Sequence, residues 1–307
     1  MNQTLRFSAL SLLVSMCVAG MAIPAEAYER TMTCEPFGQQ ACEQGQEPKP
    51  IFWPNRCVQY RINESGSSKW PGASGGTISD DLRQIVVESF ETWNAPTCTD
   101  FSMVEGELTS ATRAEYDPNK SWDENANLIV WRDDQWKNKS RAAFAVTSVS
   151  YRSSGKIADA DIEINSLHHE FDYFETSKVG QTNKIDIGNT LTHEVGHFLG
   201  LAHPSDKPES TMWREAPEGE IKKRSLEEDD IQGLCAIYPG TERGGAACSY
   251  PDDFVPPSAE QRTEASGCGC AAADPDSFPL PGLALVLVIG AALARRRLSY
   301  AETTDEN

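Results

Sequence analysis

Three histidines within eleven residues constrain this chain more than any other feature. The stretch "HEVGHFLGLAH" places His193 and His197 four residues apart, with His203 six residues further on. On a helix, side chains four residues apart project from the same face, so both imidazoles can reach one ion. Gly200 lets the backbone leave the helix sharply, so that His203 can approach the same point. The spacing therefore predicts a helix with two metal ligands and a turn that brings back a third.

Three nitrogen ligands leave one coordination position for water, which is the mark of a catalytic zinc site. Glu194 follows the first ligand and is expected beside that open position, as the base that accepts a proton from water attacking a peptide carbonyl. The alternative is a helix whose histidines serve packing or lie on the surface. Because both histidines, the glutamate, the glycine and the third histidine all stand at the required spacing, we predict that His193, His197 and His203 bind zinc and that Glu194 is catalytic.

Strand and helix patterns follow one another between about residues 50 and 240. Alternating or short apolar runs predict strands at residues 57–62, 127–131, 142–151 and 157–165. Apolar residues at helical spacing predict helices at residues 77–95, 185–200 and 225–238. The last helix should be capped by Ser225, with Glu228 as its capping-box partner. This order of elements predicts one α/β or α+β domain.

The two ends of the chain predict export. Residues 1–27 combine a basic start, a short apolar run and small residues before the end, which is the pattern of a secretory signal peptide. We predict a polar N-terminal segment, called the lead below, at residues 28–49. A linker is predicted at residues 241–266, and a sorting or transmembrane tail at residues 267–307. In that tail three arginines follow an apolar run and should stay cytoplasmic, which leaves the rest of the mature chain outside.

The charge of the chain excludes one class of partner. With 46 acidic and 27 basic residues the formal net charge is -19, and such a surface repels polyanions. We therefore expect no nucleic-acid partner. Protein or peptide substrates are expected instead, with contact to the cell surface through the tail, and we expect the protein to act as a monomer.

On its motifs the chain resembles the metzincins and, among them, the matrixins, the family of the matrix metalloproteinases. "HEVGHFLGLAH" matches the metzincin zinc signature, and "STMW" places Met212 where the family's Met-turn lies beneath the metal. The spacer "PSDKPES" and the final "LEEDDIQGLCAIY", with Asp229 and Asp230, are also matrixin-like. "VQYRI", "SFETWN", "NANLIV" and "ADADIEIN" follow in matrixin order, so the resemblance covers roughly residues 50–240.

The resemblance implies the α+β metzincin catalytic domain: a twisted, mostly parallel five-stranded sheet, three helices and a zinc cleft. Met212 would form a structural floor and would not be a ligand. The segment after Met212 would wall the primary specificity pocket. The edge strand that pairs with extended substrate would contain Ala143, Phe144, Ala145 and Val146. The implied function is that of a secreted or surface-anchored zinc endopeptidase.

Disulfides are permitted by export, and an even set of six cysteines precedes the tail. Six cysteines allow fifteen pairings, and we expect Cys34 to pair with Cys42 within the lead. Cys57 and Cys98 flank a predicted strand and the end of a predicted helix, which the matrixin fold would bring together, so we favour this second pair. The tail itself resembles myxobacterial sorting signals, in which the cysteine region is the place of cutting and anchoring.

Several features depart from the matrixin pattern. The lead contains no propeptide cysteine-switch motif, and Trp213 and Arg214 stand where Tyr-Pro is common, so pocket preference does not carry over. Asp161 stands where matrixins place histidines of a second zinc, so we do not predict that zinc. Calcium at Asp159 or Asp161 is suggested by their oxygen chemistry.

The sequence is compatible with further interpretations. His168 and His169 are adjacent, and adjacent side chains rarely bind one ion together. We therefore predict that these two histidines lie in a surface loop. A non-catalytic surface adhesin that has kept the fold is the alternative function, although a binding module has no need of Glu194. Another metzincin branch, such as the pappalysins or astacins, is the alternative family, and the match of the last helix speaks against it.

Overall fold

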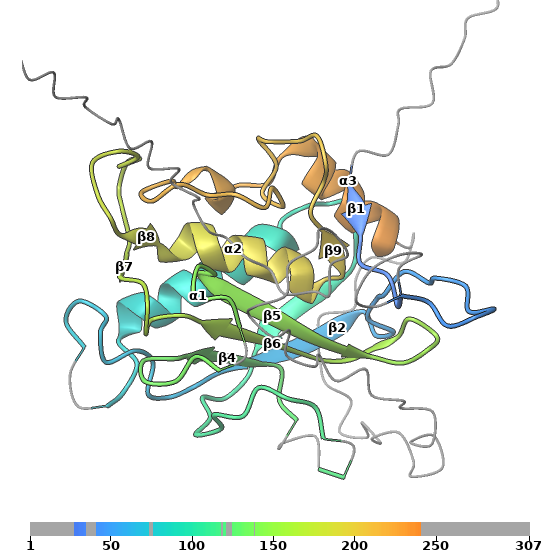
Figure 1. Cartoon of the computed structure of the whole chain (residues 1–307), viewed down its shortest axis with the longest axis horizontal. Helices are drawn as coiled ribbons and strands as arrows, with labels where there is room; N and C mark the ends of the chain where they lie inside the picture. Colours follow the sequence, from blue (N-terminus) through green and yellow to red (C-terminus); the bar gives the residue numbers. More distant parts are fainter. Residues whose placement is uncertain are drawn as a thin grey trace, which may run out of the picture.

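A five-stranded sheet with two helices across one face forms the centre of the molecule (Figure 1). The computed structural model describes residues 28–34, 41–73, 76–117, 119–120, 125–137 and 139–240. The predicted signal peptide, linker and C-terminal tail lie outside this part of the chain. Within it, no helix is long and apolar enough to cross a membrane.

The sheet has the strand order β3-β2-β4-β6-β5, and every pairing is parallel except that of β5 with β6. This confirms the predicted α+β class, with a mostly parallel five-stranded sheet. The strand β3 was not foreseen from the sequence. The five strands are β2 (Cys57–Ile62), β3 (Ser102–Glu105), β4 (Leu128–Trp131), β5 (Ala145–Tyr151) and β6 (Ile157–Ile164).

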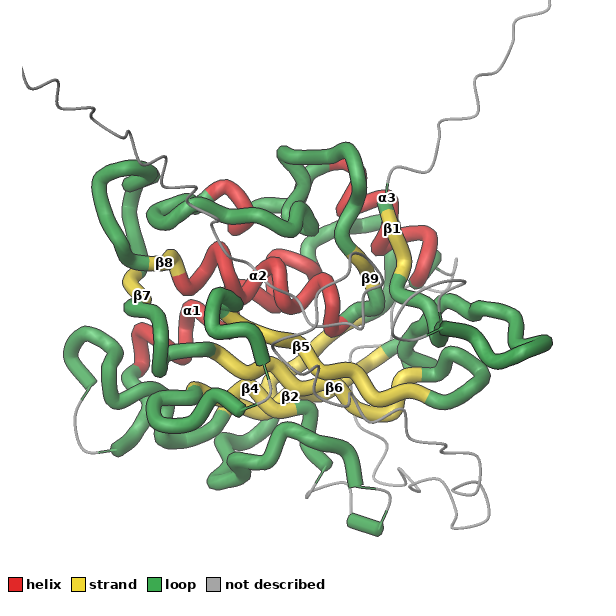
Figure 2. The backbone as a smooth tube through the Cα atoms, in the orientation of Figure 1, coloured by secondary structure: helices red, strands yellow, loops and turns green. Residues whose placement is uncertain are grey.

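Short elements complete the described fold. The strands β7 (Phe171–Asp172) and β8 (Ile185–Asp186) pair in parallel, and β1 (Glu29–Arg30) pairs antiparallel with β9 (Leu201–Ala202). The helices are α1 (Asp80–Asn94), α2 (Ile187–Phe198) and α3 (Glu228–Ile237), with a 3₁₀ turn, η2 (Lys222–Arg224), before α3. Figure 2 shows α1 and α2 together above the sheet, with loops below it.

The main core lies between the sheet and the helices α1 and α2. Tyr60 of β2 stacks on Phe90 of α1 with ring centroids 3.6 Å apart, and both side chains are buried. The Trp93 indole at the end of α1 donates to the Thr192 carbonyl of α2 at 2.8 Å. This bond joins the two helices one residue before the first predicted ligand, so the core also sets the position of the site.

The starts of α2 and α3 differ from the prediction, and capping explains both. The second helix begins at Ile187 and not at residue 185, because Ile185 and Asp186 belong to β8 and the Asp186 side chain caps the helix by accepting from the Asn189 backbone N–H. In α3 the capping box joins Glu227 and Asp230, so the prediction of Ser225 with Glu228 was wrong.

The N-terminal lead is part of the fold and contains one of the predicted disulfides. The bond Cys34–Cys42 is present, as predicted. The expected bond between Cys57 and Cys98 was wrong, because Cys98 is bonded to Cys235 of α3 and Cys57 has a different disulfide partner. The end of α3 returns to the end of α1, where the Gly240 N–H donates to the Cys98 carbonyl at 2.9 Å, and this brings Cys235 beside Cys98.

The other face of the sheet holds a buried pair of acids. Asp159 and Asp161 alternate along β6 with apolar residues that face the helices, and both are 1% exposed. Their carboxyl groups hydrogen-bond to each other, and Asp161 also accepts from the Leu128 N–H at 2.9 Å. Burial raises the pKa of both groups, that of Asp159 to about 7. The pair therefore holds a proton in the folded chain.

Replacing Asp161 with Asn should change how stability depends on pH. Because the folded-state pKa values are raised, the native pair binds more protons than the unfolded chain between the ordinary carboxyl pKa and about 7. The protonated pair therefore stabilises the folded state below this pH window, and that stabilisation is lost as the pH rises through it. Asn keeps an oxygen for Leu128 and an N–H for Asp159, so D161N should gain on the order of 1 kcal/mol relative to wild type from pH 5 to pH 8.

Thermal unfolding of the zinc-loaded protein at a series of pH values measures this difference. The exposed Asp134→Asn variant is the matched control and should follow wild type. Equal pH slopes for wild type and D161N would contradict a shared proton in the pair.

Candidate metal centre and catalytic base

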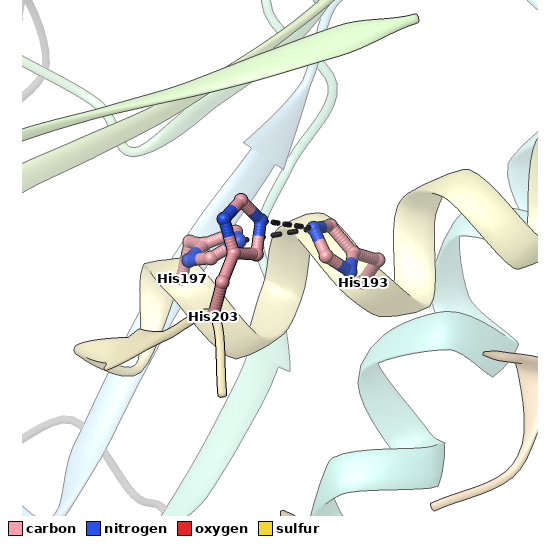
Figure 3. A group of neighbouring side chains, drawn as sticks. All are labelled: His193, His197 and His203. Carbon is pink, nitrogen blue, oxygen red and sulfur yellow. Dashed lines mark hydrogen bonds between the residues drawn. The ribbon is translucent and has the colours of Figure 1, made fainter. Parts of the chain in front are cut away.

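The three predicted ligands converge on one point. His193 and His197 project from the same face of α2, and β9 carries the chain from the end of that helix to His203 (Figure 3). The Nε2 atoms of His193 and His197 are 3.0 Å apart, and those of His193 and His203 are 3.2 Å apart. Among the described residues, this trio is the group of His, Cys, Asp or Glu side chains able to hold a metal ion.

The chemistry of these imidazoles fits zinc. The Nδ1 atom of His193 lies 2.6 Å from the Thr211 carbonyl, and that of His197 lies 2.7 Å from the Leu201 carbonyl. A carbonyl can only accept, so each Nδ1 carries the proton and each Nε2 presents a lone pair to the shared point. Tetrahedral zinc with bonds of about 2.0–2.1 Å places its nitrogen ligands about 3.3 Å apart, close to the spacing found here.

Burial keeps the three imidazoles neutral. It lowers the pKa of His193 and His197 well below the ordinary value and that of His203 to about 3. The charges of Lys223 and the other imidazoles act in the same direction on His193. Since zinc binds the neutral ring, these histidines need lose no proton to bind the metal near neutral pH.

Glu194 is completely buried beside the ligands, with one oxygen held and one unused. Its Oε2 accepts from the Thr147 hydroxyl at 2.6 Å, while Oε1 has no hydrogen-bond partner in the described part of the chain. Burial raises the pKa of Glu194 to about 8, against the opposing effects of Thr147 and Lys223. A cation bound by the neighbouring histidines would favour the carboxylate. The group is thus oriented by β5 and ready to exchange a proton at Oε1.

The Met-turn lies directly against α2. A Cβ at Gly196 would come 2.1 Å from the Met212 sulfur and 2.8 Å from the Trp93 ring. Gly196 is therefore the position in the motif that allows Met212 to approach the helix between the two ligands. Met212 is buried and is not one of the grouped ligands, and its role as a structural floor stays a prediction.

Asp230 of α3 holds the Met-turn in place. Its carboxylate accepts from the Ser210 hydroxyl at 2.5 Å, the Thr211 N–H at 2.8 Å and the Met212 N–H at 3.2 Å. Because the Thr211 carbonyl in turn fixes His193, this acid orients a ligand through one intervening residue. The sequence drew attention to Asp230 only as part of a family match.

The N-terminal lead fixes the turn that leads to His203. Arg30 pairs with Leu201 in the β1–β9 ladder, and the Thr31 N–H donates to the Gly200 carbonyl at 3.0 Å. The Leu201 carbonyl also accepts the Thr31 hydroxyl, so one carbonyl holds both the lead and the His197 ring. This role of the lead was not predicted.

The predicted substrate strand lies at the edge of the sheet. Ala145 and Val146 begin β5, whose neighbour within this sheet is β6, while Ala143 and Phe144 precede it. All four side chains are buried, so a substrate here would meet backbone groups. Thr147, two residues after Ala145, points to the same side and contacts Glu194. The prediction included its neighbours but missed this residue.

His168 and His169 lie apart from the metal centre. They are in the loop after β6, and both are partly exposed. The His168 ring contacts the Asn165 side chain at 2.9 Å, and the His169 ring contacts the Arg141 carbonyl at 3.0 Å. Their placement agrees with the predicted surface loop.

Comparison with known proteins places the chain in one group. The family model described as Matrixin matches residues 53–239. Metalloendoproteinase 5-MMP of Arabidopsis thaliana is 36% identical over 70 residues, 23% of this chain and 19% of that protein. Human Matrilysin is 35% identical over 68 residues, 22% of this chain and 25% of that protein. Metalloendoproteinase 1 of Glycine max is 34% identical over 64 residues, 21% of this chain and 20% of that protein. The chain thus spans a quarter or less of the length of these relatives.

Replacing Gly196 with Ala should damage the metal centre. The new methyl group would meet the Met212 sulfur and the Trp93 ring, which are themselves buried and cannot withdraw freely. Overpacking of this kind costs about 1–3 kcal/mol, and displacement of the Met-turn should also weaken zinc binding. Chemical unfolding and a competitive zinc titration measure the two effects.

Gly188→Ala on the same helix is the matched control, because a Cβ there would lie 3.0 Å from the Tyr173 ring and 3.2 Å from the Arg224 Nε, a much milder approach than at Gly196. It should lose less stability than G196A and keep zinc affinity. Equal zinc affinity for G196A and wild type would show that Met212 does not support the ligands.

Proposed function

We propose, because this chain belongs to the matrixin family, that it is a zinc endopeptidase that hydrolyses internal peptide bonds of extended protein substrates. One observation carries the proposal. Three neutral imidazoles converge at 3.0–3.2 Å beside a buried carboxyl group that has one oxygen without a partner among the described residues. A site used only for structure would fill all its positions, whereas hydrolysis needs a position for water and a base next to it.

His193, His197 and His203 would hold the zinc ion, with Met212 beneath them. When bound, zinc supplies Lewis acidity toward water and the substrate carbonyl. Glu194 would accept a proton from the attacking water at Oε1 and then give it to the leaving amine. Thr147 would keep the carboxyl group in position through Oε2 during both transfers. The backbone of Ala143, Phe144, Ala145 and Val146 would align the substrate by adding it as a further strand.

The cellular location is also part of the proposal. Residues 1–27, which resemble a signal peptide, and the tail, whose apolar run is followed by three arginines, support an exported protein that is secreted or held at the cell surface. Two disulfides in the described part of the chain fit an oxidising compartment. We propose that residues 50–240 act there as a monomeric catalytic domain.

Structural calcium stays a prediction. Asp159 and Asp161 would supply two carboxylates, whereas calcium takes about six to eight oxygens. A calcium ion would also have to replace the proton that the pair holds.

Removal of zinc should abolish proteolysis. Incubation of the purified, folded protein with casein and a peptide library should give internal cleavage that a chelator stops and added zinc restores, whereas added magnesium should not restore it. Mass spectrometry of the products measures cleavage. Absence of chelator-sensitive cleavage by a folded, zinc-loaded sample would favour the alternative of a surface adhesin.

Glu194→Gln should remove turnover and leave the metal in place. The amide keeps the shape of the side chain but cannot accept a proton, and loss of a general base typically costs about 10²–10⁴-fold in rate. Peptide cleavage assays and zinc content per chain measure the two properties. Retained proteolysis with full zinc content would exclude the catalytic role of Glu194.

A further inference from the structure

Lys223 is a completely buried lysine close to the metal centre. It lies in η2, on the segment between the Met-turn and α3, and its relative exposure is 0%. Lysine is almost never fully buried unless it is paired. Its burial here therefore needs an explanation.

Lys223 connects the two elements that carry the metal centre, one through its backbone and the other through its side chain. Its backbone N–H donates to the Asn189 side chain of α2 at 2.7 Å, and its ammonium donates to the Trp213 carbonyl. Asn189 lies one helical turn before His193 on the same face, and Trp213 directly follows Met212. The segment after Met212 is expected to form one wall of the specificity pocket, and Lys223 lies behind this segment.

The ammonium lacks a close carboxylate. No ion pair within 4.0 Å involves Lys223 among the described residues, although its neighbours Lys222 and Arg224 have acidic partners. Burial lowers the pKa of Lys223 to about 8, with Glu220 and Glu194 only partly opposing this effect. A buried cation with one carbonyl acceptor is costly, so a carboxylate brought by a ligand would be stabilised there.

A second cation stands on the same wall. Arg214 follows Trp213, is exposed, and has no ion pair or hydrogen bond within the described ranges. Arg214 directly follows the residue whose carbonyl accepts from the Lys223 ammonium, so both cations belong to the segment after Met212. These two cations lie on one short segment, although the chain as a whole is acidic, with a net charge of -19.

We infer that Lys223 and Arg214 form a cationic subsite that selects substrates with an Asp or Glu side chain next to the cleaved bond. Arg214 would attract the carboxylate at the rim, and Lys223 would pair with it inside the wall after turning from the Trp213 carbonyl. The long, flexible lysine side chain permits that movement. This inference rests on the proposed endopeptidase function and names its substrate class.

Matched peptides test the inference. Peptides taken from the cleaved library are synthesised with Asp, Asn, Glu or Gln at each position flanking the bond, which changes charge and keeps shape. The zinc-loaded wild type should cleave the acidic member of a pair with a kcat/KM at least about tenfold higher at one position, equivalent to about 1.4 kcal/mol. Lys223→Met should bring the ratio close to one, and Arg214→Gln should lower it and its dependence on salt.

Lys222→Met is the matched control. It removes the same charge from the adjacent residue, whose ammonium donates to the Pro208 carbonyl, and should leave the acid preference unchanged. Cleavage of the library without acid preference, or an equal loss in K222M and K223M, would overturn the inference while the endopeptidase function stands.

A binding experiment separates this inference from catalysis and from folding of K223M. Zinc-loaded E194Q keeps Lys223 and Arg214, so it should bind the acidic peptide more tightly than its amide twin by about the same factor in fluorescence anisotropy. The further variant R214Q on this background should lose part of that difference. Equal binding of the twins would overturn the inference even if no cleavage is seen, whereas the absence of any cleavage by wild type would contradict the proposed function alone.

Discussion

The metal centre depends on two backbone carbonyls that hold imidazole rings. The Thr211 carbonyl fixes the proton of His193 on Nδ1, and the Leu201 carbonyl does the same for His197. Neither carbonyl belongs to the helix that bears the rings. The helix alone can place two histidines on one face, but the chain beyond it decides which nitrogen each ring presents. A correct site therefore requires that the turn after α2 and the Met-turn both be folded.

Distant parts of the chain meet to hold those carbonyls. Asp230 of α3 anchors the Met-turn, and Thr31 of the lead bonds the Leu201 carbonyl and the Gly200 carbonyl. The disulfides Cys34–Cys42 and Cys98–Cys235 close the two regions that supply these supports. The N-terminal lead and α3 thus both stabilise the hydrogen bonds that hold the two imidazole rings. The bonds from Thr31 explain why a polar lead with little core of its own packs against the turn that carries His203.

Local patterns in the sequence predicted the elements that depend on local chemistry. Alternation placed β2 and β6, helical spacing placed α1, and the spacing of His193, His197 and His203 gave a cluster that the fold brings together. What failed depends on partners distant in sequence. The Cys98–Cys235 bond, the pairing of β1 with β9 and the contact of Thr147 with Glu194 all join segments whose approach no local pattern encodes. The cap of α3 failed for a different reason, since four acidic residues in succession, Glu227 to Asp230, offered several starts.

Buried charged groups near the metal centre differ in how fully they are bonded. Asp186 and Asp230 each accept four hydrogen bonds, two at each oxygen, and each fixes a helix start or a turn. Glu194 has an oxygen without a partner and Lys223 has a carbonyl but no carboxylate in the described part of the chain, although both are fully buried. Such groups are costly to a fold that gains nothing from them, and this cost supports the roles proposed for Glu194 toward water and for Lys223 toward substrate.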